Sequence, residues 1–324
     1  MPYILYFFIL LIIINIYFRL ADRYNIIDNP CERSSHKRPV LRGGGIIFPV
    51  GIILWFIWSG YLYPWFFAGL MIISLVSFLD DISGIKLLIR LLIHFISIIL
   101  IILQLDTVTF PWWAWIVLLI FAAGVINAFN FMDGINGITT GYSLSVLTGL
   151  WFVNQYKVHF IESELIYAIV IALIVFGIYN FRTRARCFAG DVGSVSVSFI
   201  LIFLLAKLVI TSGNIFYVMF LAVYGVDTFL TLLGRALQRE NIFTAHRRHL
   251  FQLLANEAAL PQLAISAGYA LAQLIISMLI IILSGSFQDL FLAVVSITLI
   301  IILFIVYFTA KRKILTYTRV ENLE

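Results

Sequence analysis

Apolar runs of about twenty residues recur along almost the whole chain, and they constrain the fold more than any other feature of the sequence. A helix needs about 20 mostly apolar residues to cross a bilayer, whereas the strands of a membrane β-barrel alternate polar and apolar residues. Runs such as residues 96–103 do not alternate. Only 11% of the residues are charged and 63% are apolar, whereas roughly a quarter of a soluble domain is charged. The pattern excludes a soluble enzyme and predicts an all-α polytopic membrane protein.

We count eleven such runs, joined in several places by very short turns, and we expect each run to form a transmembrane helix. The first run lacks a basic segment before it and a cleavage site after it, so we expect a retained helix rather than a signal peptide. No linker or repeat interrupts the chain, which predicts a single domain over residues 1–324. The runs are residues 2–18, 46–63, 64–79, 87–103, 110–126, 138–153, 165–180, 195–210, 215–233, 263–283 and 290–310.

The basic residues predict the orientation of these helices. If the N-terminus lies outside the cell, all of the 21 Lys and Arg residues except Lys157 and Lys207 fall in cytoplasmic segments, as the positive-inside rule requires. The C-terminus is then cytoplasmic as well. Cys31 and Cys187 would lie on the same reducing side, so we expect free thiols and no disulfide.

The first polar cluster on this predicted inner side is the segment from Ser34 to Gly45. It combines His36, Lys37, Arg38 and Arg42 with three consecutive glycines. Basic side chains suit an anionic ligand, and glycines allow backbone N–H groups to approach phosphate oxygens. A flexible turn that anchors the chain at the membrane is the alternative.

Two adjacent acids, Asp80 and Asp81, follow the third run directly, with Lys86 and Arg90 shortly after them. Neighbouring carboxylates repel each other unless a cation lies nearby, which favours a functional site. The alternative is that the acids cap the next helix, where negative charge is favourable.

Polar residues recur at every third position in the third cluster, at Asn127, Asn130, Asp133 and Asn136. Residues 127–137 contain no Lys or Arg, so Asp133 has no local counter-ion. An unpaired buried carboxylate is costly, and a metal ion is a natural partner for it. Ordinary turn formation explains only part of this run.

Two further clusters come later in the chain. Asp191 stands between glycines at a helix entrance, where it is either an N-cap or a metal ligand. His246, Arg247, Arg248 and His249 form a basic segment in the longest predicted cytoplasmic loop, and such side chains bind phosphate or sugar groups. A zinc site is the rival interpretation, and it would draw its further ligands from Cys31, Cys187 or His36.

Together these clusters combine four acids with an excess of Arg and His, which suits Mg²⁺ and a polyphosphate. Mg²⁺ takes one or two carboxylates and completes its shell with phosphates and waters, and Mn²⁺ could replace it. A soluble nucleotide can reach this face, and the helical body implies that the second substrate is a lipid. A transporter or lipid flippase is the alternative, but such proteins place charges near the bilayer midplane.

Four motifs resemble, in order and helical context, the polyprenyl-phosphate N-acetylhexosamine-1-phosphate transferases of glycosyltransferase family 4, which include MraY, WecA and WbpL. They are Asp-Asp-Ile-Ser-Gly, Asn-Ala-Phe-Asn-Phe-Met-Asp-Gly-Ile-Asn-Gly, Phe-Ala-Gly-Asp-Val-Gly-Ser and His-Arg-Arg-His. The resemblance implies transfer of a sugar 1-phosphate from a UDP-N-acetylhexosamine to undecaprenyl phosphate, with release of UMP and a requirement for Mg²⁺. It also implies an active site that faces the cytoplasm from the bacterial inner membrane.

The resemblance also implies roles for individual residues. Asp80, Asp81 and Asp133 would be the catalytic acids, the first two lying beside the lipid phosphate and metal, and Asn130 and Asp191 would hold the metal or diphosphate. Arg90 would meet the diphosphate and Asn136 the uracil. The full set of expected substrate-binding residues is His36, Arg42, Arg90, Asn127, Asn136, His246, Arg247, Arg248 and His249.

The His-Arg-Arg-His segment departs from the His-x-His-His-His form of MraY and WecA. It looks more like the WbpL branch, which initiates O-antigen synthesis for lipopolysaccharide and the cell envelope, and it leaves GlcNAc, FucNAc and QuiNAc open as the sugar. Beyond these substrates and membrane lipids we expect no nucleic-acid partner. A homodimer is compatible with the sequence.

Overall fold

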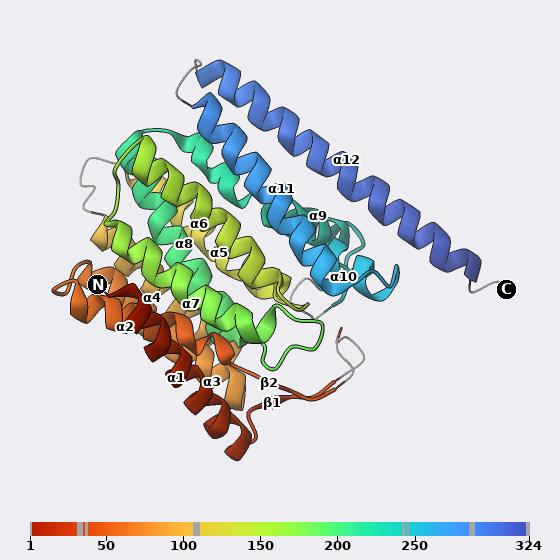
Figure 1. Ribbon diagram of the computed structural model, residues 1–324. Coiled ribbons are helices and arrows are strands. Elements are labelled where there is room, and N and C mark those ends of the chain that lie inside the picture. Colours follow the sequence, from red (N-terminus) through yellow and green to blue (C-terminus); the bar gives the residue numbers. More distant parts are fainter. Residues whose placement is uncertain are drawn as a thin grey trace.

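The computed structural model describes residues 2–30, 35, 38–105, 111–241, 244, 246–284 and 289–321, and it shows a bundle of long helices (Figure 1). The helices are α1 (Tyr3–Arg23), α2 (Ile47–Trp58), α3 (Pro64–Ser83), α4 (Leu87–Gln104), α5 (Trp112–Met132), α6 (Ile138–Tyr156), α7 (Ser163–Asn180), α8 (Gly190–Ser212), α9 (Ala222–Leu237), α10 (Leu250–Asn256), α11 (Gln262–Leu283) and α12 (Asp289–Glu321). Short 3₁₀ helices, η1 (Gly44–Ile46) and η2 (Ile215–Leu221), precede α2 and α9. A small antiparallel hairpin pairs β1 (Ile27–Asp28) with β2 (Val40–Leu41).

The prediction of an all-α polytopic membrane protein is confirmed, and each of the eleven predicted runs falls on a helical segment. Among the described residues, nine helical segments are long and apolar enough to cross a membrane, with η2 and α9 forming one of them. The other two runs are the shorter segment Gly44–Trp58 and the helix α6, whose interior is rich in Ser and Thr. The sequence did not predict α10, a short helix in the long loop after α9. The orientation of the bundle stays a prediction.

Helix α8 forms the centre of the bundle, and 83% of the residues in its most apolar 18-residue stretch are buried. It is apolar on all sides, as expected of a helix surrounded by others. On the α3 side, the ring of Phe203 stacks on that of Phe66 with centroids 4.2 Å apart. Nearer the start of α8, the hydroxyls of Ser196 and Ser74 form a buried hydrogen bond of 2.7 Å. The first residues of α8 are therefore fixed against the last turns of α3.

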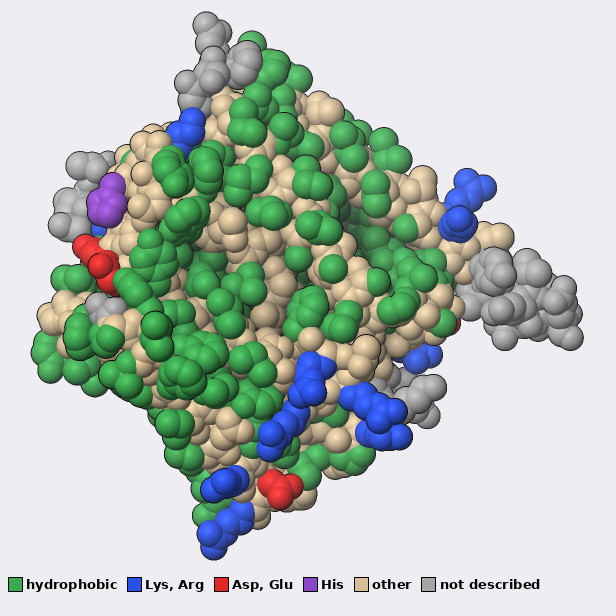
Figure 2. Space-filling view, in the orientation of Figure 1, with side chains coloured by type: hydrophobic (Ala, Val, Ile, Leu, Met, Phe, Trp, Pro, Cys, Tyr) green, Lys and Arg blue, Asp and Glu red, His purple; other side chains and the backbone are tan. Residues whose placement is uncertain are grey.

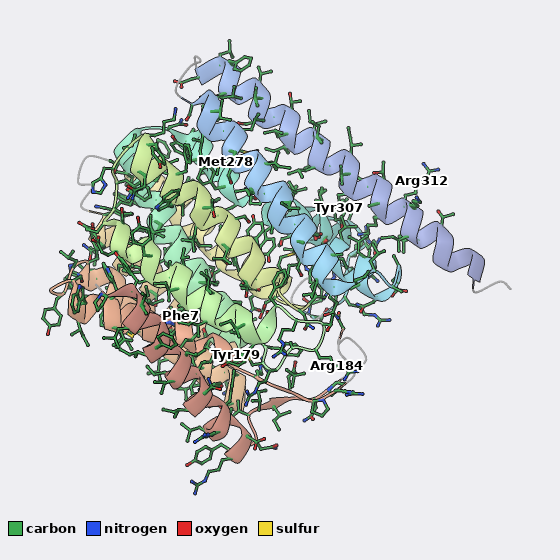
Figure 3. The ribbon with its side chains drawn as sticks, in the orientation of Figure 1. Phe7, Tyr179, Arg184, Met278, Tyr307 and Arg312 are labelled. Carbon is green, nitrogen blue, oxygen red and sulfur yellow. The ribbon has the colours of Figure 1, made fainter. Side chains whose placement is uncertain are left out.

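Polar connections gather at one end of the bundle. The β-hairpin and the turn after α7, which carries Arg184, lie at this end (Figures 1 and 3). Figure 2 shows a broad apolar surface across the visible face and a group of Lys and Arg side chains near the hairpin. The charge distribution along the helices thus matches that of a membrane-spanning bundle with one strongly basic end.

The glycine triplet before α2 allows η1 to pack directly on the start of α8. A Cβ atom on Gly45 would lie only 2.2 Å from the Cα atom of Gly193. The N–H groups of Gly44 and Gly45 donate to the carbonyls of Phe188 (2.9 Å) and Ala189 (3.0 Å). Our expectation that the glycines leave backbone N–H groups for a phosphate is therefore wrong for these two residues, because both groups already have backbone partners.

We predict that Gly45→Ala lowers the thermal unfolding temperature of the detergent-solubilised protein. The added methyl group meets backbone rather than a movable side chain, and overpacking of this kind costs about 1–3 kcal/mol. Gly124→Ala is the matched control, because a Cβ atom there meets nothing within 4 Å. Equal unfolding temperatures for the two variants would contradict the close approach of η1 and α8.

Candidate active site

Three acids and two arginines from four separate parts of the chain meet at the polar end of the bundle. Asp80 and Asp81 belong to the last turn of α3, and Asp191 to the first turn of α8. Arg42 follows β2 and pairs with Asp81, with its Nε atom 2.7 Å from Oδ1. Arg90 of α4 pairs with Asp80, with Nη1 2.6 Å from Oδ2. Three carboxylates face two guanidinium groups, so the cluster carries a formal excess of negative charge.

Asp191 makes the longest ion pairs of the three acids in this cluster. Its carboxylate oxygens lie 3.4 Å from Nη2 of Arg42 and 3.4 Å from Nη1 of Arg90, beyond the 2.7–2.9 Å typical of strong charge-assisted bonds. Its side chain is 20% exposed, compared with 8% for Asp80 and 0% for Asp81. A ligand that enters the cluster would therefore reach Asp191 most easily.

Asp81 has a structural role that the sequence did not indicate. Its Oδ1 and Oδ2 atoms accept the backbone N–H groups of Asp191 (2.9 Å) and Val192 (3.0 Å). The first N–H groups of a helix lack partners within the helix and attract negative charge. Asp81 therefore caps α8 from a distant helix, while Asp191 lies inside the first turn. Neither capping alternative derived from the sequence holds. Asp191 does not cap its own helix, and α4 has no side-chain cap, since Asp80 accepts the N–H of Ile85, which precedes the helix.

Arg42 is positioned by the same carboxylates. Burial lowers the pKa of its guanidinium group, but the carboxylates of Asp81 and Asp191 outweigh burial and the net shift is upward. Arg42 therefore keeps its charge within the cluster. Since its Nε atom is used by Asp81, its remaining N–H groups are the ones that could meet a phosphate.

Residues 127–137, the third polar cluster of the sequence and called the third motif below, reach the acid cluster through Asn130 and Asp133. The amide of Asn130 donates to Oγ of Ser194 (3.3 Å) and its side chain also bonds Asp191. Asp133 follows α5, and its Oδ1 atom accepts a hydrogen bond from Thr139. Burial raises the pKa of the Asp133 carboxyl to about 7, and the nearby carboxylates of Asp191 and Asp81 act in the same direction, against the Thr139 hydrogen bond and Arg42.

The other two asparagines of this motif make local hydrogen bonds. Asn127 donates its amide to the carbonyl of Ala123, 2.8 Å away in the same helix. Asn136 is buried, and its amide donates to the carbonyl of Arg182 at 2.8 Å. In the described part of the chain neither side chain bonds to the acid cluster, and their binding to substrate stays a prediction.

The basic segment lies beside the third motif. The rings of His246 and His249 stack with centroids 4.9 Å apart, and they lie 6.4 Å and 6.1 Å from the ring of Phe131. Burial lowers the pKa of His246 to about 4, and electrostatic interactions with His249, Arg235 and Arg248 act in the same direction. His246 is therefore neutral at pH 7.

Both arginines of the basic segment have acidic partners. Arg248 pairs with Glu240, with Nη1 2.5 Å from Oε1, and Arg247 lies 3.8 Å from Glu257. These acids are eight and ten positions away in the sequence, so the residues next to the two arginines gave no sign of them. A substrate phosphate would compete with Glu240 and Glu257 for these guanidinium groups.

The structure does not support the zinc alternative. Cys187 is a buried free thiol, and burial raises its pKa above the ordinary value. His36 and Cys31 lie outside the described residues. Within the described residues, no three His, Cys, Asp or Glu side chains come together as a metal-binding group. Mg²⁺ needs fewer protein ligands than zinc, because one or two protein oxygens suffice when phosphates and waters complete its shell. Asp191 and Asn130 could supply these oxygens.

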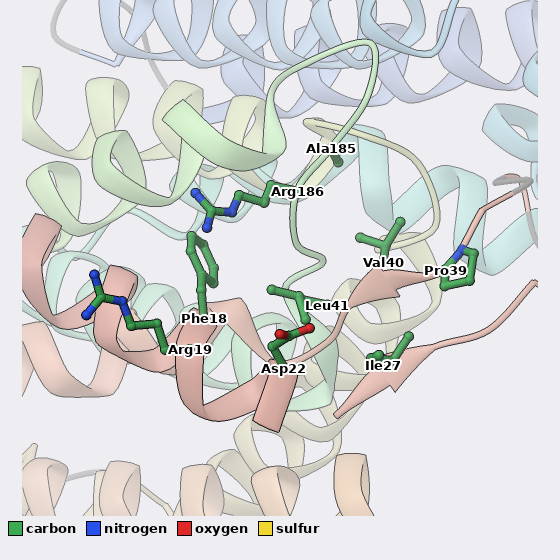
Figure 4. A pocket seen from close by; sticks show the side chains of 9 residues that line it. All are labelled: Phe18, Arg19, Asp22, Ile27, Pro39, Val40, Leu41, Ala185 and Arg186. Atoms are coloured by element: carbon green, nitrogen blue, oxygen red, sulfur yellow. The ribbon is translucent and has the colours of Figure 1, made fainter. Parts of the chain in front are cut away.

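A groove of about 490 Å³ lies between the end of α1, the β-hairpin and the turn after α7 (Figure 4). It is lined by Phe18, Arg19, Asp22, Ile27, Pro39, Val40, Leu41, Ala185 and Arg186. The guanidinium of Arg186 lies over the ring of Phe18 at 4.7 Å. None of the predicted site residues lines this groove, and we assign it no part in the site.

Residues 63–212 match the sequence profile of glycosyl transferase family 4. The chain carries a glycosyl transferase family 4 domain. The matched range contains Asp80, Asp81, Asn130, Asp133 and Asp191, but neither Arg42 nor the basic segment. The resemblance inferred from the four motifs is thus confirmed at the level of the family, and the site extends beyond the matched range on both sides.

Three relatives illustrate the similarity. The chain is 26% identical to a probable undecaprenyl-phosphate N-acetylglucosaminyl 1-phosphate transferase of Bacillus subtilis (strain 168), over 75% of this chain and 74% of the relative. It is 27% identical to the undecaprenyl-phosphate alpha-N-acetylglucosaminyl 1-phosphate transferase of Escherichia coli (strain K12), over 58% and 57%. It is 29% identical to a phospho-N-acetylmuramoyl-pentapeptide-transferase of Synechococcus, over 48% and 52%. The last two matches span only about half of each relative.

We predict that Asp81→Asn lowers the thermal unfolding temperature more than Asp191→Asn does. The first change removes the charge that caps α8 and pairs with Arg42. Because the Arg42 side chain is 35% exposed, we expect a cost below the roughly 3–5 kcal/mol of a fully buried ion pair. The second removes a charge from a cluster that has an excess of negative charge. Differential scanning fluorimetry in detergent measures both, and a larger loss for Asp191→Asn would contradict the capping role of Asp81.

Proposed function

We propose that this protein transfers an N-acetylhexosamine 1-phosphate from a UDP-sugar to undecaprenyl phosphate and releases UMP. The observation that supports this most is the convergence of three acids from two motifs, Asp80, Asp81 and Asp191, with Arg42 and Arg90 at the polar end of a membrane bundle. Two of the relatives named above, those of Bacillus subtilis and Escherichia coli, are undecaprenyl-phosphate transferases by name. We place the reaction at the cytoplasmic face of the bacterial inner membrane, where the nucleotide is available.

The reaction joins two anions. An oxygen of the lipid phosphate attacks the β-phosphorus of the UDP-sugar, a new P–O bond forms, and the bond from that phosphorus to the UMP oxygen breaks. The second pKa of a phosphate monoester is about 6, so most of the lipid phosphate already lacks this proton near pH 7. The larger requirement is to hold the two negatively charged groups together, which favours positioning and electrostatic stabilisation over general-base catalysis.

The residues of the cluster divide this work. Arg42 and Arg90 have N–H groups beyond those that bind Asp81 and Asp80, and they would neutralise and orient the phosphates. Asp80 and Asp81 hold these arginines in place, and Asp133 extends the acidic surface toward the basic segment. We therefore expect Asp80 and Asp81 to position groups rather than to remove a proton.

The oxygen donors fit Mg²⁺ or Mn²⁺. Asp191 is the acid that its cationic neighbours satisfy least, and Asn130 lies next to it. When bound there, Mg²⁺ would neutralise charge that develops on the diphosphate during transfer. Asp191 and Asn130 would hold the ion, while the arginines stay with Asp80 and Asp81.

We further propose that the product starts a cell-envelope polysaccharide such as the O-antigen of lipopolysaccharide. The His-Arg-Arg-His segment supports this, because it departs from the His-x-His-His-His form of MraY and WecA and looks more like the WbpL branch. GlcNAc, FucNAc and QuiNAc are the sugars to test first.

The deciding experiment measures UMP release by the purified protein in vesicles that contain undecaprenyl phosphate, with several UDP-N-acetylhexosamines. We expect release from at least one of them, with formation of the lipid-linked sugar diphosphate. Vesicles without undecaprenyl phosphate are the control. A folded protein that releases no UMP from any of these sugars would overturn the proposal and favour a transporter or flippase.

We predict that Asp191→Asn reduces transfer by about 100-fold or more, as expected when a residue that holds the metal is lost. The Mg²⁺ concentration needed for half-maximal activity should rise, while the unfolding temperature stays close to that of the wild type. Asp22→Asn, the same change at an exposed acid outside the cluster, is the control. Near-normal activity at ordinary Mg²⁺ concentrations would show that Asp191 does not hold the metal.

A further inference from the structure

Asp227 is a buried acid that the acid cluster does not use. It lies in α9, within the apolar span Ile215–Leu237, and its residue is only 3% exposed. A buried carboxylate is costly unless hydrogen bonds and nearby charges compensate for the loss of water. Its partners therefore indicate what the acid stabilises.

These partners come from three helices. Oδ1 of Asp227 accepts hydrogen bonds from the backbone N–H of Leu250 (3.0 Å) and from Thr231 (3.2 Å), and Oδ2 accepts one from the hydroxyl of Tyr269 (2.7 Å). The ring of His249 is adjacent, with Nδ1 3.4 Å from Oδ1. Leu250 is the first residue of α10 and Tyr269 belongs to α11. Asp227 thus ties the start of α10 to the body of the bundle.

The start of α10 is also the end of the basic segment His246–His249. On its other side, this segment faces the third motif, since Phe131 lies beside both histidine rings. A Cβ atom on Gly134 would lie 3.0 Å from the ring of Phe251 in α10. The distance between the basic segment and Asp133 therefore depends on where α10 begins.

A second link extends from Asp227 to the last helix. The hydroxyl of Thr231 lies 2.9 Å from that of Tyr307, a buried residue of α12 that is labelled in Figure 3. Lys311 donates to the Tyr307 hydroxyl at 2.8 Å. The carboxylate is thus held by a network that includes α9, α11 and α12, which makes it a rigid anchor for the segment.

We propose that Asp227 is a positioning residue, which holds the basic segment His246–His249 beside the third motif so that the segment can meet the sugar and phosphates of the nucleotide substrate. The inference rests on the proposed function for the identity of the substrate. The anchoring itself rests only on the contacts of Asp227, and the two parts can be tested separately.

Hydrogen exchange measured by mass spectrometry tests the anchoring without any substrate. Asp227→Asn keeps the shape of the side chain and removes its charge, and a charge-assisted hydrogen bond is roughly twice as strong as a neutral one. We expect amides of residues 246–256 to exchange about tenfold faster than in the wild type. Thr231→Val is the comparison variant: it loses the hydrogen bonds to Asp227 and Tyr307 but keeps the bond from the N–H of Leu250, so we expect a smaller acceleration of exchange. Unchanged exchange in Asp227→Asn would overturn the anchoring.

A backbone variant tests the same bond with Asp227 in place. Leu250→Pro removes the N–H group that Asp227 accepts, at the first helical position, where proline is tolerated. His249 has φ −63° and ψ 148°, a conformation that suits the residue before a proline. Leu250→Ala is the control, because it also loses the leucine side chain but keeps the N–H group. We expect faster exchange and weaker activity in Leu250→Pro than in Leu250→Ala, and equal behaviour of the two would contradict the proposal.

Kinetics tests whether the anchoring acts through the segment. We expect Asp227→Asn to raise KM for the UDP-sugar about tenfold and to leave KM for undecaprenyl phosphate unchanged. In a double-mutant cycle, adding Asp227→Asn to His249→Ala should cause little further loss of kcat/KM. If the loss of kcat/KM in the double variant equals the product of the two single-variant losses, Asp227 acts independently of the segment. If the wild type uses no UDP-sugar, the proposed function fails, and the exchange measurements still decide the anchoring.

Discussion

The hydrogen bonds from the start of α8 to the carboxylate of Asp81 are the interaction on which the rest of the site depends. They join the last turn of α3 to the first turn of the central helix, and the same carboxylate holds Arg42. The close approach of Gly45 to Gly193 occurs at this same helix start. Asp191, one position after the start of α8, takes its place between Arg42 and Arg90 as a consequence.

The balance of charge in this cluster explains what it can bind. Two guanidinium groups offer N–H groups to anions, and the extra carboxylate leaves room for a cation. A metal-bound diphosphate contains both kinds of charge, whereas a simple anion would meet repulsion from Asp191. Under the proposed function, we therefore expect a metal ion and the diphosphate to bind the cluster together.

Two buried acids, in different halves of the chain, each accept backbone N–H groups at the start of another helix. Asp81 accepts the first free N–H groups of α8, and Asp227 accepts the N–H of the first residue of α10. In each case a carboxylate on one membrane helix fixes the beginning of another helix that carries functional residues. Each acid loses its hydration on burial, and the unpaired N–H groups at a helix start compensate for part of that loss. Positioning by capping allows a bundle of apolar helices to place polar groups accurately at its edge.

The sequence by itself determined the helices and most of the candidate residues. Apolar runs must form helices in a membrane because every backbone polar group has to be satisfied within its own segment, and the acids stand out in a chain with so few charges. The sequence did not reveal α10, a short polar helix with no span-length signal. Only the tertiary structure decided which partner each acid has. Asp81 caps a helix that begins 109 residues later, Arg248 pairs with Glu240, and the N–H groups of Gly44 and Gly45 bond to backbone carbonyls before α8. These outcomes depend on side chains that meet across helices, and no local pattern in the sequence encodes such meetings.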